Sequence, residues 1–433
     1  MAITKEIYRQ YLAILEEELL PAMGCTEPIA VAYAAALAVR ELDCLPETIR
    51  INVSGNIIKN VKSVVVPNTG GLRGLEAAAA AGIVAGNADR ELEVIADVTD
   101  DQRKQIVAFL QQTAFRVTES SSGLIFDIEV ALAGGGHTAI CRITDHHTHV
   151  TRLERDGSVL LDLPAASCGE IHATDRSILN VAGIVAFADE VAIGNVKELL
   201  DRQISFNMAI AQAGINRPYG ARIGRILMDA YGDTVFNRAK AMAAAASDAR
   251  MNGCSLPVVI NSGSGNQGIT ASVPVVVYAR ELGVSKDTLY RALVVSNLIT
   301  IHLKTGIGRL SAYCGAISAG CGAGSGVAYL YGGREDRIAH TIVNAVAINS
   351  GVICDGAKSS CAAKIASAVE AGLLGMQMAK RGSEFYSGDG IVIKGVENTI
   401  SNVGRLAREG MAETDKKIID IMLNSSHSGQ TRA

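Results

Sequence analysis

Apolar and polar positions recur with two different periods along this chain, and the change of period divides it. In residues 4–20 and 27–41 the apolar positions are three and four apart, which predicts two helices. Pro21 and Pro28 bracket a short segment between these helices. Because proline favours turns and helix starts over helix interiors, this segment is predicted to be a turn. We therefore expect Cys25 at the entrance of the second helix.

The pattern changes to that of β-strands from about residue 47 to residue 165. Apolar residues alternate with polar ones or form short runs, which predicts strands near residues 48–55, 61–68, 92–98, 124–134, 137–147 and 148–157. Two segments of helical character, 74–86 and 100–113, lie among them. An α+β domain is therefore expected here.

After about residue 170 the chain is almost continuously alanine-rich and helical. It is interrupted by glycine-rich breaks at residues 261–268, 314–326, 352–361 and 386–392. The fold class expected is α+β, with a large Ala/Gly-rich helical domain and an inserted or N-terminal α+β domain. The expected parts are N-terminal helices that carry Cys25 and pack on the helical domain (1–45), an α+β domain (46–165) and a helical catalytic domain (166–433).

Composition and charge narrow the classes of function. Aromatic residues make up only 4% of the 433 residues and Trp is absent, so a platform for stacking bases is not expected. The formal charge of −4, with Lys and Arg evenly scattered, gives no basic stripe for nucleic acid or an anionic membrane. Charged residues near the N-terminus interrupt any secretory signal, which favours a cytoplasmic location. The many small residues are compatible with a homodimer.

Two uncharged segments, residues 251–279 and 310–333, raise the alternative of a membrane-embedded protein. Glycines interrupt both of them, so neither is a run of about 20 mainly apolar residues. Glycine at this density more often marks closely packed helices or a site lined by backbone. A membrane partner is therefore not expected.

Three of the nine cysteines fall in two glycine-rich breaks. Cys314 lies in LSAYCGAIS, and Cys354 and Cys361 lie in VICDGAKSSC. Thiolates on loops can hold a 4Fe–4S cluster, and three of them leave one iron open as a Lewis acid. The spacing alone leaves two alternatives, that these cysteines are small core residues or that Cys321 is also a ligand.

Cys25, in MGCTEP, begins a predicted helix, whose positive end lowers the pKa of a thiol. Its thiolate could act as a base, a nucleophile or a fourth cluster ligand. The alternative is an inert cysteine near a helix cap. Glu27 could orient the ammonium group of a substrate, or it could merely favour the first helical turn.

Two polar loops are candidates for binding a substrate. In residues 261–268, NSGSGNQG, successive backbone N–H groups and short polar side chains can form a nest for a carboxylate, with Ser262, Ser264 and Asn266 as candidates. The loop PNTGG adds Asn68 and Thr69, and we expect it to face the same cavity. An ordinary structural turn is the alternative for the first loop.

Other clusters carry weaker indications. The run DHHTH, residues 145–149, resembles a metal site, but it lies where two strand patterns meet, which favours a hairpin turn. Five lysines are possible Schiff-base residues without a distinguishing context, namely Lys59, Lys62, Lys304, Lys358 and Lys364. A pyridoxal-dependent lyase is accordingly the main rival among enzymes. The remaining cysteines are expected to pack or to face solvent: Cys44, Cys141, Cys168 and Cys254.

Four segments, in this order, resemble the L-cysteine desulfidase family, a serine-dehydratase-like family. They are MGCTEPIAVAYAAA, NSGSGNQGITASVPV, HLKTGIGRLSAYCG and VICDGAKSSCAAKIA. The resemblance covers about residues 5–422. The helical half is also similar to the α domain of bacterial iron–sulfur L-serine dehydratases.

The resemblance implies an iron–sulfur lyase that converts L-cysteine to pyruvate, ammonia and sulfide with a 4Fe–4S cluster and without pyridoxal phosphate. It implies that Cys314, Cys354 and Cys361 hold the cluster and that Cys25 is the reactive cysteine. The link GAKSSC that follows Asp355 is shorter than that of serine dehydratases, which favours L-cysteine as substrate. The alternatives are an L-serine dehydratase of the same mechanism and a non-catalytic amino-acid-binding or sensor protein.

Overall fold

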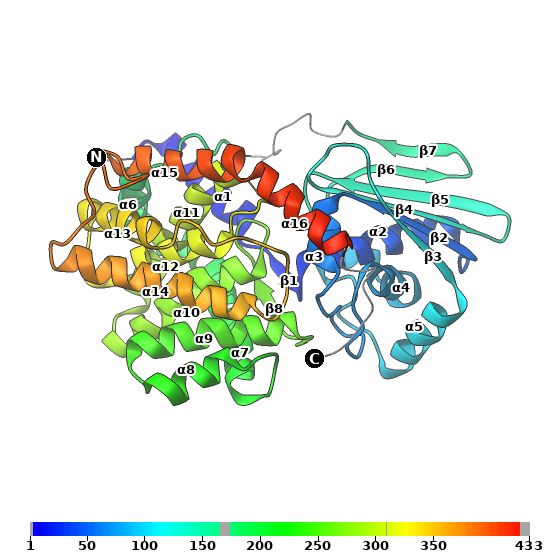
Figure 1. Ribbon diagram of the computed structural model, residues 1–433, viewed down its shortest axis with the longest axis horizontal. Coiled ribbons are helices and arrows are strands. Elements are labelled where there is room, and N and C mark those ends of the chain that lie inside the picture. The colour runs from blue at the N-terminus through cyan, green and yellow to red at the C-terminus, as the bar shows by residue number, and fades with distance from the viewer. Residues whose placement is uncertain (1–2, 165–173, 309, 425–433) are drawn as a thin grey trace.

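The computed structural model describes residues 3–164, 174–308 and 310–424. A large helical part lies beside a smaller part built on a sheet (Figure 1). This confirms the expected α+β class with a large helical portion. The boundary expected at residues 165–166 and the expectation for Cys168 lie outside the described residues.

The N-terminal segment is shared between the two parts. Its elements are α1 (Lys5–Glu18), β1 (Pro21–Met23) and α2 (Thr26–Leu42). The rings of Tyr8 and Tyr11 in α1 pack edge-on against Phe187 of the helical part. Helix α2, in contrast, packs on the sheet. The expectation placed both helices on the helical part; α2 lies elsewhere because it is apolar on nearly all sides and is buried between the sheet and another helix.

The sheet has six strands in the order β3-β2-β4-β5-β6-β7. They are β2 (Thr48–Val53), β3 (Ala114–Glu119), β4 (Asp127–Gly134), β5 (His137–Thr144), β6 (Val150–Arg155) and β7 (Ser158–Asp162). Strands β2 and β3 are parallel and all other pairs are antiparallel. The four strands expected near residues 48–55, 124–134, 137–147 and 148–157 are present.

Two segments that were expected to be strands are not strands in the structure. In addition, the edge strands β3 and β7 were not predicted from the sequence. Residues 61–68 follow α3 (Gly55–Val61) as a loop in which Val65 makes only an isolated bridge with Arg73. Residues 92–98 follow the short helix η1 (Ala88–Glu93) as turns. Their apolar residues, such as Val66 and Ile95, are fully buried without strand pairing. A short apolar run can fill a core from a loop as well as from a strand.

One face of the sheet is covered by helices. Besides α2 and α3 this part contains α4 (Leu75–Ala85) and α5 (Asp100–Gln112), both expected from the sequence. Helix α2 lies against β4, β5 and α4. A Cβ atom on Gly82 of α4 would lie 2.1 Å from the carbonyl oxygen of Ala32 in α2, so the two helices can cross this closely only with glycine there.

Small residues set the spacing of the helical part. Its elements are α6 (Val181–Glu190), α7 (Ile193–Asn216), α8 (Ile223–Tyr231), α9 (Val235–Met251), β8 (Pro257–Val259), α10 (Gly265–Leu282), α11 (Lys286–Ile307), α12 (Gly315–Leu330), α13 (Glu335–Ile348), α14 (Cys361–Lys380), α15 (Val396–Arg405), η2 (Leu406–Gly410) and α16 (Ala412–Asn424). A Cβ atom on Gly324 of α12 would lie 2.3 Å from the carbonyl oxygen of Gly372 in α14. Helices α12 and α14 therefore pack in close contact.

None of the helices in the described residues is long and apolar enough to span a membrane. The glycine-rich stretch within residues 310–333 forms most of α12, which is almost entirely buried among other helices. Close helix packing is therefore the structural role of these glycines, as the sequence indicated.

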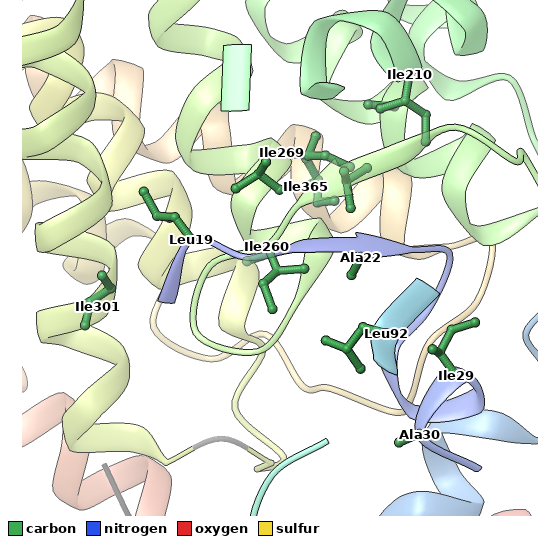
Figure 2. Packing of buried hydrophobic residues seen from close by; sticks show 14 of the residues in the cluster. Leu19, Ala22, Ile29, Ala30, Leu92, Ile210, Ile260, Ile269, Ile301 and Ile365 are labelled. Carbon is green, nitrogen blue, oxygen red and sulfur yellow. The ribbon is translucent and has the colours of Figure 1, made fainter. Parts of the chain in front are cut away.

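Contacts between described elements join the sheet part to the helical part. Strand β1 pairs antiparallel with β8, and α16 leaves the helical part to pack on α3 (Figure 1). Figure 2 shows buried side chains on both sides of the β1 ribbon, with Ile269 and Ile365 on one side and Ala22, Ile29 and Leu92 on the other. The hydrophobic core is therefore continuous across the junction, and Cys25 follows β1 at that junction.

Candidate active site

The N-termini of four helices meet at one cavity between the two parts. Cys25 is the N-cap of α2, Ser264 of α10 and Cys314 of α12, and Cys361 is the first residue of α14. All four line the cavity, which encloses about 730 Å³ with its open mouth included. Because each helix N-terminus carries a partial positive charge, this arrangement favours thiolates and anionic ligands.

Backbone pairing brings Cys314 and Cys354 together. Tyr313 and Ile353 form an isolated antiparallel bridge, and the N–H of Cys314 donates to the carbonyl of Val352 at 3.0 Å. The thiols are close enough for Cys314 to donate a hydrogen bond to Cys354. The two glycine-rich breaks, 40 residues apart in the sequence, thus contribute neighbouring sulfur atoms.

The charges around Cys354 favour its thiolate. The hydrogen bond from Cys314 is the largest cause, and Lys59 and Lys304 add positive charge; together they outweigh burial and lower the pKa of Cys354 to about 5. The same hydrogen bond, followed by burial, raises the pKa of Cys314 well above its usual value. The shared hydrogen bond therefore favours the thiolate at Cys354 and the thiol at Cys314.

Cys361 reaches the cavity through a tight turn. Gly356 has φ 92°, and a Cβ atom there would lie 2.1 Å from the carbonyl oxygen of Lys59, so the turn requires glycine. Burial, and secondarily the charge on Cys354, raises the pKa of Cys361. The turn packs directly on α3, which ties the third thiol to the sheet part.

Asp355 fixes this turn to α14. Burial favours its neutral form, but hydrogen bonds from Lys358 and Lys364 outweigh that effect and lower the pKa of Asp355 to about 2. Lys364 also donates to the carbonyl of Ile353 at 2.8 Å. These two lysines, considered above as Schiff-base candidates, therefore stabilise the cysteine-bearing loop.

Cys25 lies in the same cavity in a different environment. It is 2% exposed, and its Sγ donates to Oε2 of Glu27 at 3.1 Å. Burial, and then the charge of Glu27, raises the pKa of Cys25 well above its usual value, although Arg250 opposes this. The expected lowering of this pKa by the helix dipole is wrong, because burial and a neighbouring carboxylate outweigh a partial charge. Cys25 is a neutral thiol paired with a carboxylate.

The five residues expected to bind substrate are placed differently. Ser264 and Asn266 line the cavity. Ser262, with φ 49°, donates through its hydroxyl to the side chain of Asn261 at 2.9 Å and is not among the described residues that line the cavity. Its role is to shape the turn that precedes α10.

The side chains of Asn68 and Thr69 donate hydrogen bonds to nearby backbone carbonyls. The amide of Asn68 donates to the carbonyls of Ile95 and Ala96, both at 2.9 Å, and the hydroxyl of Thr69 donates to the carbonyl of Val66 at 2.7 Å. Neither belongs to the cavity lining in the described part of the chain. Pro67 in their loop lies against Gly24, the residue before Cys25.

Sequence reasoning missed Arg250 and Gln267, which both line the cavity. Arg250 lies in the last turn of α9 and is 2% exposed, and no described residue accepts a hydrogen bond from its Nε. Oε1 of Gln267 is likewise buried without a donor among the described residues. The available indication was an arginine in AAAASDARMNG, where alanines on every side of a helix imply complete burial.

Comparison with known proteins places the chain in a family. The family model described as serine dehydratase alpha chain matches residues 89–420. The chain belongs to the serine dehydratase alpha chain family. It is 58% identical to the UPF0597 protein of Desulfitobacterium hafniense (strain Y51), with 97% of this chain and 98% of that protein covered. It is 48% identical to the UPF0597 protein of Lachnoclostridium phytofermentans, with 96% and 100% covered.

Membership of the serine dehydratase alpha chain family indicates a lyase, and this family is commonly linked to iron–sulfur clusters. In the described residues, no three His, Cys, Asp or Glu side chains converge as they would around a single metal ion. The cavity instead has three thiols spread along its wall, and a cluster takes thiolates at separate irons. This donor set fits a cluster, and ligation by Cys314, Cys354 and Cys361 stays a prediction.

Two other sequence candidates lie apart from this site. Cys321 is buried in α12 and does not belong to the described cavity lining. The run at residues 145–149 forms the turn between β5 and β6, where the rings of His146 and His149 stack. The hairpin interpretation of that run is therefore correct.

Proposed function

We propose that this serine dehydratase alpha chain family member is a β-elimination lyase that converts L-cysteine to pyruvate, ammonia and sulfide, without pyridoxal phosphate. The observation that carries the proposal is that Cys314, Cys354, Cys361 and Cys25 line one cavity. The first three would hold a 4Fe–4S cluster, and Cys25 would handle the proton of the substrate.

Such a cluster, when bound, supplies a Lewis acid that stabilises negative charge on the sulfur that leaves. The chain provides the conditions for holding it. Lys59 and Lys304 place positive charge near Cys354, which compensates for the charge of the thiolates. The N-termini of α12 and α14 act in the same direction.

Cys25 and Glu27 form the proposed proton-transfer pair. The carboxylate of Glu27 takes the thiol proton, and the Cys25 thiolate then takes the proton from Cα of the substrate. A thiolate with a raised pKa is a strong base once formed, which suits a weakly acidic carbon. Departure of the thiol group as sulfide leaves aminoacrylate, which takes up water and yields pyruvate and ammonia.

Ser264 and Asn266 are proposed to position the substrate. They stand at the N-terminus of α10, where backbone N–H groups and the helix dipole favour a carboxylate. The substrate proposed is a small amino acid, with neither nucleic acid nor a membrane as partner. We also propose a cytoplasmic location and, as an assembly compatible with the many small residues, a homodimer.

Dehydration of L-serine is the second candidate, because the matching family model is that of the serine dehydratase alpha chain. The same proton transfer would act, with water leaving in place of sulfide. The two reactions differ in one product, which makes them easy to separate.

The test uses protein purified and reconstituted with iron and sulfide without air. Pyruvate and sulfide are measured with L-cysteine, and pyruvate alone with L-serine. The proposal expects pyruvate and sulfide in equal amounts from L-cysteine and a lower kcat/KM for L-serine. Higher kcat/KM for L-serine would favour the second candidate, and no pyruvate from either amino acid would contradict both.

A further inference from the structure

Arg250 is the largest fully buried side chain of the described residues, and it lies in the wall of the cavity. It forms no ion pair with a carboxylate in the described part of the chain, and its Nε has no hydrogen-bond partner there. Burying one N–H donor of a charged group without a hydrogen-bond partner is costly, because that donor loses its contact with water. A ligand atom that accepts a hydrogen bond from this Nε would remove that cost.

The other cations of the cavity are already engaged. Lys59 pairs with Asp415 of α16 at 2.5 Å, and Lys364 pairs with Asp355. Lys304 donates to the carbonyl of Gly308. Among the described cationic side chains that line the cavity, only Arg250 has a buried N–H group without a hydrogen-bond acceptor.

The position of Arg250 is built into the start of α10. A Cβ atom on Gly265 would lie 2.4 Å from Nε of Arg250 and 2.8 Å from its Cζ, so the guanidinium lies directly on that glycine. Its charge also acts on Cys25. Arg250 therefore stands between the proposed carboxylate-binding helix terminus and the proposed base.

Two acceptors complement this cation. Oδ1 of Asn266 and Oε1 of Gln267 are buried and have no donor among the described residues, and both side chains line the same cavity. A ligand that satisfies all three groups must bring an anion with hydrogen-bond acceptors and a group that donates. A guanidinium matches a carboxylate through two parallel N–H bonds, and amide oxygens match an ammonium group.

We propose that Arg250 binds the α-carboxylate of the substrate and that the amide oxygens of Asn266 and Gln267 accept hydrogen bonds from its α-ammonium. The cavity then selects free α-amino acids over amines, amides and esters. The proposal deepens the proposed function, on which it rests for the identity of the reacting side chain, but the binding itself needs no turnover.

The test compares the affinities of L-alanine and L-alaninamide by calorimetry on the anaerobic, iron-loaded protein. L-Alanine keeps both charged groups but has no leaving group, and L-alaninamide replaces the carboxylate by a neutral amide. The wild type is expected to bind L-alanine more tightly by about 10- to 100-fold, since hydrogen bonds to charged groups contribute on that order. Arg250→Gln should remove this preference while its affinity for L-alaninamide stays unchanged.

Iron content and circular dichroism serve as controls for Arg250→Gln. If that variant does not fold, Arg250→Lys is measured instead. Lysine keeps the positive charge but lacks the two parallel N–H donors of the guanidinium, so the preference for L-alanine should be weaker than in the wild type but still present. A wild type without the preference, an Arg250 variant that retains it in full, or equal losses for both ligands would each overturn the proposal.

Turnover separates this proposal from the proposed function. An Arg250-dependent preference in a protein that yields no sulfide from L-cysteine would leave the carboxylate site standing and remove the desulfidase reaction. If Arg250→Gln releases sulfide from L-cysteine with an unchanged KM for L-cysteine, the desulfidase reaction stands and the carboxylate site at Arg250 is removed.

Discussion

Two cysteines of the same cavity, the half-buried Cys354 on the helical side and the buried Cys25 on the sheet side, have pKa values shifted in opposite directions. Hydrogen bonding from Cys314 and the charges of Lys59 and Lys304 lower the pKa of Cys354 to about 5. Burial and the carboxylate of Glu27 raise the pKa of Cys25. The difference teaches that hydrogen-bond partners, burial and neighbouring charges together outweigh a helix terminus in setting the pKa of a cysteine.

The two environments suit different tasks. Thiolate character is what a metal ligand needs, and on the helical side the lowered pKa of Cys354 favours it. A thiol that keeps its proton and has an acceptor beside it suits reversible proton transfer. We propose that the helical side holds a cofactor and the sheet side moves a proton, so substitutions on each side should give different losses.

The largest effect is expected on the helical side. Cys354→Ser should remove most of the iron and lower turnover by more than about 1000-fold, because the serine hydroxyl is a poor thiolate substitute. Iron content and sulfide release are measured on the same sample. Cys321→Ser is the matched control, since Cys321 is buried in α12 away from the cavity lining; it should keep both. A Cys354→Ser protein with full iron would break the comparison.

On the sheet side, Cys25→Ala should keep the iron and lower kcat by about 100- to 10,000-fold, the range of a general base. The reason is that alanine removes the proposed proton acceptor without touching the three thiols of the helical side. Iron analysis and steady-state kinetics check this. Loss of iron together with activity would assign Cys25 as a ligand and erase the distinction between the two sides.

A smaller change sharpens the cause assigned to the acidity of Cys25. Glu27→Gln removes a negative charge that raises the pKa of Cys25, so this pKa should fall and the thiolate fraction at a given pH should rise. Alkylation of Cys25 by iodoacetamide, followed by peptide mass spectrometry across pH, should shift to lower pH in the variant. An unchanged profile would mean that burial alone sets the acidity.

The smallest effect on activity is expected far from the cavity. Asp127 on β4 is 1% exposed and accepts two hydrogen bonds from Arg142, at 2.8 and 2.9 Å. Asp127→Asn should lower the free energy of unfolding by about 2 kcal/mol at neutral pH, the scale for hydrogen bonds to a charged group, because Arg142 is partly exposed. Steady-state kinetics should show kcat and KM unchanged.

The stability difference between wild type and Asp127→Asn should depend on pH, because the pKa of Asp127 is lowered in the folded protein. Burial favours the neutral form of Asp127, but hydrogen bonds from Arg142, Ser122 and Ser120 outweigh burial and lower its pKa. The stabilisation is therefore complete above the usual aspartate pKa of about 4 and is lost as the pH falls through the lower folded value. Denaturant unfolding at several pH values should show the difference between wild type and variant shrinking in acid.

The sequence predicted the location of the thiols better than their chemistry. Cys314, Cys354 and Cys361 could be found because glycine-rich breaks in long helices mark sites where backbone must bend, and the structure brings them into one cavity. The acidity of Cys25 could not be predicted, because it depends on burial and on the orientation of Glu27. Pairing of this kind is a property of tertiary contacts.

The polar loops and the apolar runs show the same limit. Asn68 and Thr69 are polar residues in a glycine-rich loop, as binding residues often are, yet they satisfy nearby carbonyls. Residues 61–68 and 92–98 have apolar runs typical of strands and fill the core as loops and turns. In each case the local pattern is compatible with two structures, and contacts distant in sequence decide between them.

The most direct measurement of the central claim determines iron, acid-labile sulfide and sulfide released from L-cysteine on one anaerobically reconstituted sample. The account predicts about four irons and four sulfides per chain, together with stoichiometric release of sulfide and pyruvate. Protein that stays iron-free after reconstitution, or that binds iron and releases no sulfide, would contradict the assignment of the cavity as an iron–sulfur desulfidase site.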